Sequence, residues 1–370
     1  MKYIRQTDRE FYTHFNSLAG LVRYLNLPVL GYYALLVILP VLLLPGCAKP
    51  GPRQDVPFTG TGTDSVPVKV TILKSDKDAI SDMDIFVFND DALQRLDCYQ
   101  RFGGTDEGIL EIASRSGDKK ITVCANSQRD RDQWKGINSR ESLSYVMAEL
   151  EKEHQEHPLM TAETRVRAGN DGSASAPLCM ERLASEIVLR SISCDFSGKP
   201  YAAETLKDVK VYLTNVNASC KIMAGGDIAP ERIINSGCLC HDDLEKFSEP
   251  GIIAQVIGRP IGKETFRADI TLLCYPNCGT QESPGSPFTR LVIEGKAGDA
   301  TWYWPIDINR NSGHQEGNGR GIERNCRYVY DLKIRRKGSS DPDIPVSAED
   351  LEINLEIKEW NTKEEYGVRF

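Results

Sequence analysis

Apolar and polar residues alternate with a period of two along most of the chain beyond residue 65. The clearest segments are Val68–Ile72, Ile121–Ala125, Val209–Leu213, Phe266–Cys274, Cys326–Ile334 and Leu351–Ile357. A period of two places successive side chains on opposite faces of a strand, so each segment is predicted to be a half-buried β-strand. The run Ile85–Phe88 is apolar throughout, which predicts a central strand that is covered on both faces.

Helical periodicity is confined to two places. Asn138 can cap a helix, and Glu141 completes a capping box three residues later. The apolar stripe that follows consists of Leu143, Val146, Met147 and Leu150. This pattern predicts one amphipathic helix that ends before Pro158, and a shorter helix is expected at His241–Phe247. Because the strands are joined by connections rather than by regular helices, antiparallel β-sandwiches are favoured over a parallel sheet.

Two β-sandwich domains are expected. The polar, Gly-rich segment AGNDGSASAP lies between two groups of predicted strands. A length of 370 residues leaves room for two domains after a targeting segment. We therefore expect an N-terminal domain over residues 66–175 and a C-terminal domain over residues 176–370. The predicted fold class is mainly β, with one or two short helices.

The amino-terminal segment has the features of an export signal. Residues Leu30–Leu44 carry no charge; this stretch is shorter than the ~20 residues of a membrane-spanning helix and fits a signal-peptide core. The next residues, Leu44-Pro45-Gly46-Cys47, resemble a bacterial lipobox, in which a small residue precedes a cysteine that is diacylated before cleavage. We expect a lipoprotein signal peptide over residues 1–46, a lipid on Cys47 and a flexible tether over residues 47–65. The alternative is a short, uncleaved membrane anchor with Cys47 unmodified.

The charge distribution argues against a nucleic-acid partner. The formal net charge is −8, and residues 1–46 carry a net charge of +2, which leaves −10 for the remainder. Binding to a phosphate backbone requires clustered Lys and Arg. An acidic surface instead keeps a protein soluble through self-repulsion.

The cysteines do not predict a metal site. With Cys47 assigned to lipid, ten of the eleven cysteines remain. They can form disulfides or stay as buried thiols, as at Cys194 and Cys326. The clusters Cys238–His241 and Cys274–Cys278 lack the CxxC spacing of a compact zinc site.

The sequence contains no familiar catalytic motif. It has no GxSxG elbow, no P-loop and no HExxH. His154 and His157 would share one face at the end of the predicted helix and could bind a metal there, but a solvated helix end is the favoured interpretation. We therefore expect a non-enzymatic protein without a cofactor.

Two tryptophans suggest an alternative function. Trp302 and Trp304 are two residues apart in a predicted strand, so both point to one side, with Tyr303 opposite. If they are exposed, they can stack on a sugar ring, as aromatic platforms do. If they are buried, they fill the core of a sandwich, which is the favoured interpretation.

Three passages resemble the fimbrillin family, the subunits of type V fimbriae that Gram-negative anaerobes secrete as lipoproteins. They are MDIFVFNDDALQRLDCYQ (Met83–Gln100), ITVCANS (Ile121–Ser127), and ERNCRYVYDLKIRRKG followed by DLEINLEIKEWN (Glu323–Gly338 and Asp350–Asn361). The likeness extends over most of residues 66–370. It implies two transthyretin-like β-sandwich domains and assembly with other fimbrial subunits.

The resemblance also implies assembly by strand exchange, in which a protease cuts after an Arg, the first strand leaves, and a strand of the next subunit fills the groove. The first strand here would be Val66–Leu73. The residues of the expected donor strand are Leu351, Ile353, Leu355, Ile357, Tyr366, Val368 and Phe370. Arg53 is the only Arg between Cys47 and the first strand. Processing at Arg53 would release the lipid and leave that strand in place.

Three functions follow from these features. The leading hypothesis is a structural or adhesion subunit of surface fimbriae, held on the outer membrane through its lipid and able to contact a host or bacterial surface ligand. The second is a surface glycan-binding outer-membrane lipoprotein that uses Trp302 and Trp304. The third is a secreted hydrolase of an unfamiliar type.

Overall fold

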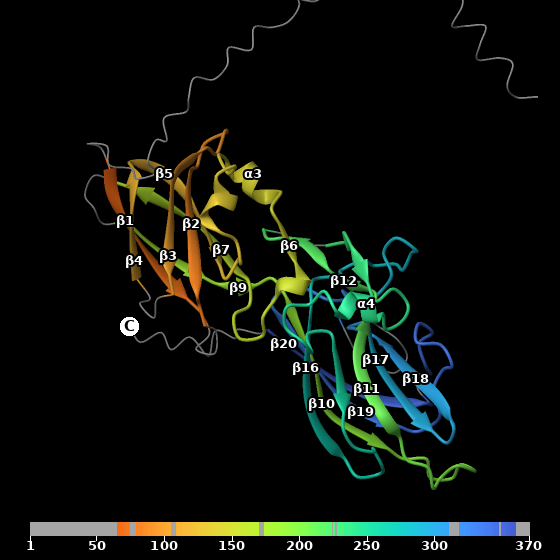
Figure 1. The fold of residues 1–370 in the computed structure, drawn as a ribbon. Helices are drawn as coiled ribbons and strands as arrows, with labels where there is room; N and C mark the ends of the chain where they lie inside the picture. Colours follow the sequence, from red (N-terminus) through yellow and green to blue (C-terminus); the bar gives the residue numbers. More distant parts are fainter. Residues whose placement is uncertain are drawn as a thin grey trace, which may run out of the picture. The chain divides into compact units, whose positions relative to one another are not determined.

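The computed structural model describes residues 65–74, 79–104, 109–169, 174–223, 225, 228–310, 318–347 and 349–359. Strands dominate these ranges, and they form two β-sandwiches that we name the first and the second sandwich (Figure 1). The expected β-sandwich fold is confirmed. The described helices are short, and none of them combines the length and apolarity that a bilayer span requires.

The first sandwich has two sheets. One contains β4 (Ile109–Arg115), β1 (Ser65–Leu73) and β8 (Ala174–Cys179), in that order. The other contains β3 (Leu96–Gly103), β2 (Asp82–Asn89), β5 (Gly117–Ala125), β7 (Met160–Ala168) and β9 (Glu181–Arg182). The core between them includes Ile85, Val87, Ile121 and Val123, which are all fully buried.

The second sandwich also has two sheets. One contains β16 (Phe266–Cys274), β10 (Ser185–Cys194), β19 (Cys326–Ile334) and β20 (Leu351–Glu359). The other contains β15 (Ala254–Ile257), β11 (Lys207–Thr214), β17 (Arg290–Ala297) and β18 (Ala300–Asp307). Two small ladders join β12 (Val216–Asn217) to β14 (Ile233–Ile234), and β13 (Ser219–Lys221) to β6 (Met147–Glu149).

Neither sandwich is purely antiparallel. β1 runs parallel to β8, and β10 runs parallel to β19. Each parallel pair joins segments that are distant in the sequence, so no hairpin is required between them. The chain passes from the sheets of the first sandwich to those of the second between Arg182 and Ser185. The boundary expected at residues 175/176 therefore falls inside β8. The assignment of these two groups as separate domains stays a prediction.

The apolar run Ile85–Phe88 forms the central part of β2, and all four side chains are fully buried. Ile85 and Val87 face the core of the first sandwich. Phe86 packs edge-on against Trp134, with ring centroids 5.1 Å apart. The expectation of a strand covered on both faces is therefore confirmed.

The predicted long helix is wrong. Only α3 (Arg140–Ser144) is helical, and it is capped by Ser139, whose Oγ accepts a hydrogen bond from the Ser142 amide at 3.2 Å. Met147–Glu149 instead forms β6 and pairs with β13, and a 3₁₀ turn, η2 (Leu150–Lys152), follows. Tertiary pairing with β13 satisfies the backbone here and overrides the local periodicity. The shorter helix expected near His241 is present as α4 (His241–Leu244).

Candidate assembly site

β1 lies in the middle of its sheet and has a hydrogen-bonded neighbour on each side. It pairs antiparallel with β4 from Ser65 opposite Arg115 to Thr71 opposite Ile109. It pairs in parallel with β8 from Val68 opposite Ala174 to Leu73 opposite Cys179. If β1 left, both neighbours would expose a row of unpaired backbone N–H and C=O groups, which is a template for another strand.

The side chains of β1 alternate between core and solvent. Val68 and Val70 are fully buried, and Val66 and Ile72 are 8% exposed. Lys69, between the two central valines, is exposed. Because burial of each such aliphatic side chain contributes about 1.5–3 kcal/mol, a vacant β1 groove would be unstable until another alternating apolar strand filled it.

β20 is the edge strand of the second sandwich. It pairs with β19 along its whole length, from Leu351 opposite Ile334 to Glu359 opposite Cys326, and it has no partner strand on its other side within the described residues. Its apolar face becomes more exposed along the strand. Leu351 is fully buried, Ile353 and Leu355 are half-buried, and Ile357 is 36% exposed.

Charged side chains hold β20 on its sheet. The Arg190 guanidinium on β10 contacts Asp331 of β19 and donates a hydrogen bond through Nη1 to Glu356 Oε2 of β20 at 3.0 Å. The Arg190 hydrogen bonds, with a further one from Ser191, lower the pKa of Asp331 to about 2. Arg335 pairs in the same way with Glu352. These side chains are partly exposed, so each pair contributes modestly.

The structure places the other predicted site residues as follows. Cys47, Arg53, Tyr366, Val368 and Phe370 lie outside the described residues. The predicted first strand, Val66–Leu73, coincides with β1. Leu351, Ile353, Leu355 and Ile357 of the expected donor strand share one face of β20.

The two tryptophans do not form an open platform. Trp304 is fully buried, and its Nε1 donates a hydrogen bond to the Arg336 carbonyl at 3.0 Å. Trp302 is half-buried against the same core, and Lys337 Nζ lies 5.7 Å from the centre of its ring. Core packing explains both residues, so the structure gives no support to glycan stacking.

The predicted histidine pair does not lie on a helix. His154 Nδ1 lies 3.2 Å from Glu249 Oε2, and His157 follows in a bend. Within the ranges given above, no three His, Cys, Asp or Glu side chains converge as a metal site would require. Cys194 is a buried free thiol, and burial raises its pKa to about 12.

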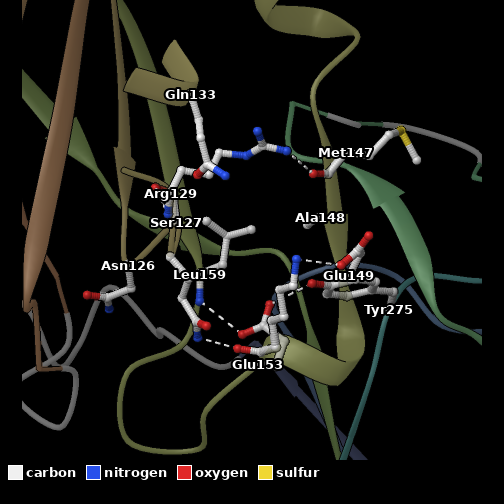
Figure 2. Close-up of a pocket in the computed structure, with 12 residues that line it drawn as sticks. Asn126, Ser127, Arg129, Gln133, Met147, Ala148, Glu149, Glu153, Leu159 and Tyr275 are labelled. Carbon is white, nitrogen blue, oxygen red and sulfur yellow. Dashed lines mark hydrogen bonds and ion pairs between the residues drawn. The ribbon is translucent and has the colours of Figure 1, made fainter. Parts of the chain in front are cut away.

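A small polar cavity of about 100 Å³ lies beside β6 and η2 (Figure 2). Its most unusual residue is Glu153, which is only 3% exposed. The Tyr275 hydroxyl donates to Glu153 Oε1 at 2.9 Å, and the Leu159 amide donates to Oε2 at 3.1 Å. Burial raises the pKa of Glu153 to about 7. From the sequence, Glu153 was expected at the solvated end of a helix, where it could assist the histidines in binding a metal, so its burial was not predicted.

The remaining groups of the cavity are engaged in local structure. Figure 2 shows Arg129 directed at the Met147 carbonyl, to which Nη2 donates at 2.8 Å. The Arg129 guanidinium also lies 5.3 Å from the centre of the Trp134 ring. Asn126 donates through Nδ2 to the Pro158 carbonyl at 3.0 Å. These contacts fix the segments around the cavity and do not assemble a nucleophile with a base.

Comparison with known proteins identifies the class of fold. No family model and no curated protein matches the chain at the level of sequence. A provisionally assigned cell adhesion protein from Bacteroides eggerthii superposes with a TM-score of 0.63 at 14% identity, covering 80% of this chain and 96% of its own. A second such protein, from Parabacteroides distasonis, gives a TM-score of 0.59 at 18% identity, covering 80% and 97%.

A third similar structure carries a more specific name. A fimbrilin, FimA, from Porphyromonas gingivalis gives a TM-score of 0.56 at 16% identity, covering 80% of this chain and 97% of its own. The chain thus has the fold of these fimbrial and cell adhesion proteins. On the level of the fold, the resemblance to the fimbrillin family is confirmed.

Proposed function

We propose that the chain is a non-enzymatic structural or adhesion subunit of surface fimbriae that assembles by strand exchange. The observation that carries this proposal is the position of β1, which is paired on both sides and inserts four alternating apolar side chains into the core. A fold shared with a fimbrilin and with cell adhesion proteins supports it.

In this proposal, removal of β1 opens a groove between β4 and β8. A donor strand would supply main-chain hydrogen bonds to both edges and apolar side chains to the vacated pockets, as in other strand-addition complexes. The carboxy-terminal segment is our proposed donor, from Leu351, Ile353, Leu355 and Ile357 to Tyr366, Val368 and Phe370. The increasing exposure along β20 supports this choice, because Ile357, near the end of the strand, is the least buried of its apolar residues.

Export and anchoring belong to the same proposal. We propose that residues 1–46 direct export, that Cys47 carries the lipid on the outer membrane, and that residues 47–65 form the tether. Cleavage after Arg53 would free the body from the lipid but leave β1 in place, so opening the groove requires a separate cut between β1 and β2. Labelling cells with a fatty-acid analogue should label the chain, and the Cys47→Ser variant should lose the label. An unlabelled wild-type chain would contradict the lipid assignment.

Strand exchange can be tested with a specific protease site placed at residues 75–78, between β1 and β2. After cleavage and a short exposure to mild denaturant, a fluorescent peptide of residues 351–370 should bind and displace the fragment that carries β1. The matched control peptide has Asp in place of Ile353, Leu355 and Ile357, and should not bind. Retention of the β1 fragment with no peptide bound would refute the proposal.

A further inference from the structure

A lysine, an asparagine and an aspartate meet inside the first sandwich. Lys119 of β5 lies directly opposite Asn89 of β2 in the antiparallel ladder. Lys119 Nζ is 2.6 Å from Asn89 Oδ1 and 2.9 Å from Asp97 Oδ2. The side chains of Lys119 and Asp97 are each only 2% exposed. An amine, a carboxamide and a carboxylate are thus brought together away from solvent.

The local backbone of β3 directs the Asp97 side chain toward Lys119. Cys98 pairs with Val87 and Leu96 pairs with Phe88, so Asp97 is the extra residue of a β-bulge in β3. A bulge of this kind redirects a side chain. Asp97 Oδ2 also accepts hydrogen bonds from Ser114 Oγ at 3.0 Å and from the Arg115 amide at 2.9 Å, both on β4. Both sheets of the sandwich therefore fix the carboxylate beside the amine.

If Lys119 and Asp97 formed only an ion pair, their burial would cost free energy. Removing two charges from water costs more than their attraction returns unless the geometry is very good. A lysine amine acts as a nucleophile once a neighbouring base has taken its proton. Burial acts to raise the pKa of Asp97, but hydrogen bonds from the Arg115 backbone and from Lys119 lower it overall. Asp97 is therefore a carboxylate, the form that can accept that proton.

We propose that Lys119 and Asn89 form an intramolecular isopeptide cross-link, with Asp97 as the base. Asp97 takes a proton from the Lys119 ammonium, and the neutral Nζ attacks Asn89 Cγ. The bond from Cγ to Nδ2 then breaks, and the nitrogen leaves as ammonia. The leaving ammonia takes the proton held by Asp97, so one ammonium ion is released and the Asp97 carboxylate is restored. No oxidant, reductant or further reactant is needed.

The cross-link would close a covalent loop from Asn89 to Lys119. This loop contains β3 and β4, and β4 is the antiparallel partner of β1. Tension along the chain would therefore pass directly from β2 to β5 through this bond, and β3 and β4 would not be extended. The inference rests on the side chains of the first sandwich alone and does not require the proposed fimbrial function.

Peptide mass spectrometry of the full-length protein purified from its own cells tests this inference. After trypsin, we expect a branched peptide that joins the segments around Asn89 and Lys119 and has the mass of the two linear peptides minus one ammonia. Lys119→Arg keeps the positive charge beside Asp97 but cannot form the bond, so it should yield only linear peptides. Asp97→Asn removes the base and should strongly reduce the branched product.

Three results would overturn the inference. Linear peptides only, with normal tryptic cleavage after Lys119, would show a plain ion pair. A branched peptide lighter by one water would place the bond on Asp97 instead of Asn89. Full cross-linking in the Asp97→Asn variant would show that Asp97 does not act as the base. None of these results depends on polymer formation, so failure of the fimbrial proposal would be seen separately.

Discussion

Glu153 provides a quantitative test of the packing beside β6. Its carboxyl group is buried, and its two oxygens accept hydrogen bonds from Leu159 and Tyr275. Burial disfavours the charged form and raises the pKa from 4.5 to about 7 in the folded protein. The substitution Glu153→Gln keeps the shape of the side chain. Its amide can still accept from the Leu159 N–H and can donate to the Tyr275 oxygen.

The sign of the pH dependence follows from proton linkage. Below pH 4.5 both the folded and the unfolded protein hold the proton, so the raised pKa costs nothing. Between pH 4.5 and about pH 7 the folded protein keeps a proton that the unfolded chain releases, so stability falls as the pH rises. Above pH 7 the full cost is present. At about 1.4 kcal/mol for each pH unit, the cost is about 3 kcal/mol.

Urea unfolding of the wild type and of Glu153→Gln measures this cost. We expect the free energy of unfolding of the wild type, relative to the variant, to fall by about 3 kcal/mol across that pH range. Glu149→Gln is the matched control on the same segment. The Glu149 side chain is 50% exposed, and its hydrogen bond with Lys152 lowers its pKa, so no such fall is expected. Parallel stability curves for the wild type and Glu153→Gln at every pH would refute the reasoning.

Three further substitutions, and Lys69→Ala as a control, test the strands. Val70→Ala should lower the free energy of unfolding by ~2 kcal/mol, since it removes two buried methylene equivalents, whereas Lys69→Ala on the exposed face of β1 should change it little by the same measurement. Arg190→Ala should speed hydrogen exchange of the β20 amides while leaving those of β1 unchanged, because it releases Glu356 and Asp331; equal rates in β20 would contradict this role. Trp304→Ala should destabilise the protein by about 3–5 kcal/mol in urea, and polysaccharide retention in affinity gels should not change with it.

The strands could be predicted from the sequence because a period of two is a local signal. Cys326–Ile334 and Leu351–Glu359 are both strands, as their alternation indicates. Their partners could not be predicted in the same way. The parallel pairing of β10 with β19 places Glu186 opposite Arg327. No local feature of the sequence indicates a contact between segments that are so far apart.

The wrong helix and the features that were not predicted also arise from contacts between distant segments. The apolar stripe after Asn138 is a valid helical pattern, but Met147 pairs with Lys221 of β13, which is distant in the sequence. Glu153 is buried in part because Tyr275, 122 residues later, covers it. Asp97 reaches Lys119 only because a bulge in β3 shifts the register. Each of these features depends on tertiary contacts that local periodicity does not contain.

Assembly through the carboxy-terminal segment is the central claim, and unheated gels of cell-surface extracts test it most directly. Three chains are compared: the full-length protein, a variant without residues 360–370, and a variant of full length in which a Gly/Ser sequence replaces those residues. All three retain β20, so its packing in the second sandwich is preserved. We predict a ladder of higher-order species for the full-length protein and its loss in both variants. A monomer for the full-length protein, or an unchanged ladder in the variants, would contradict the account.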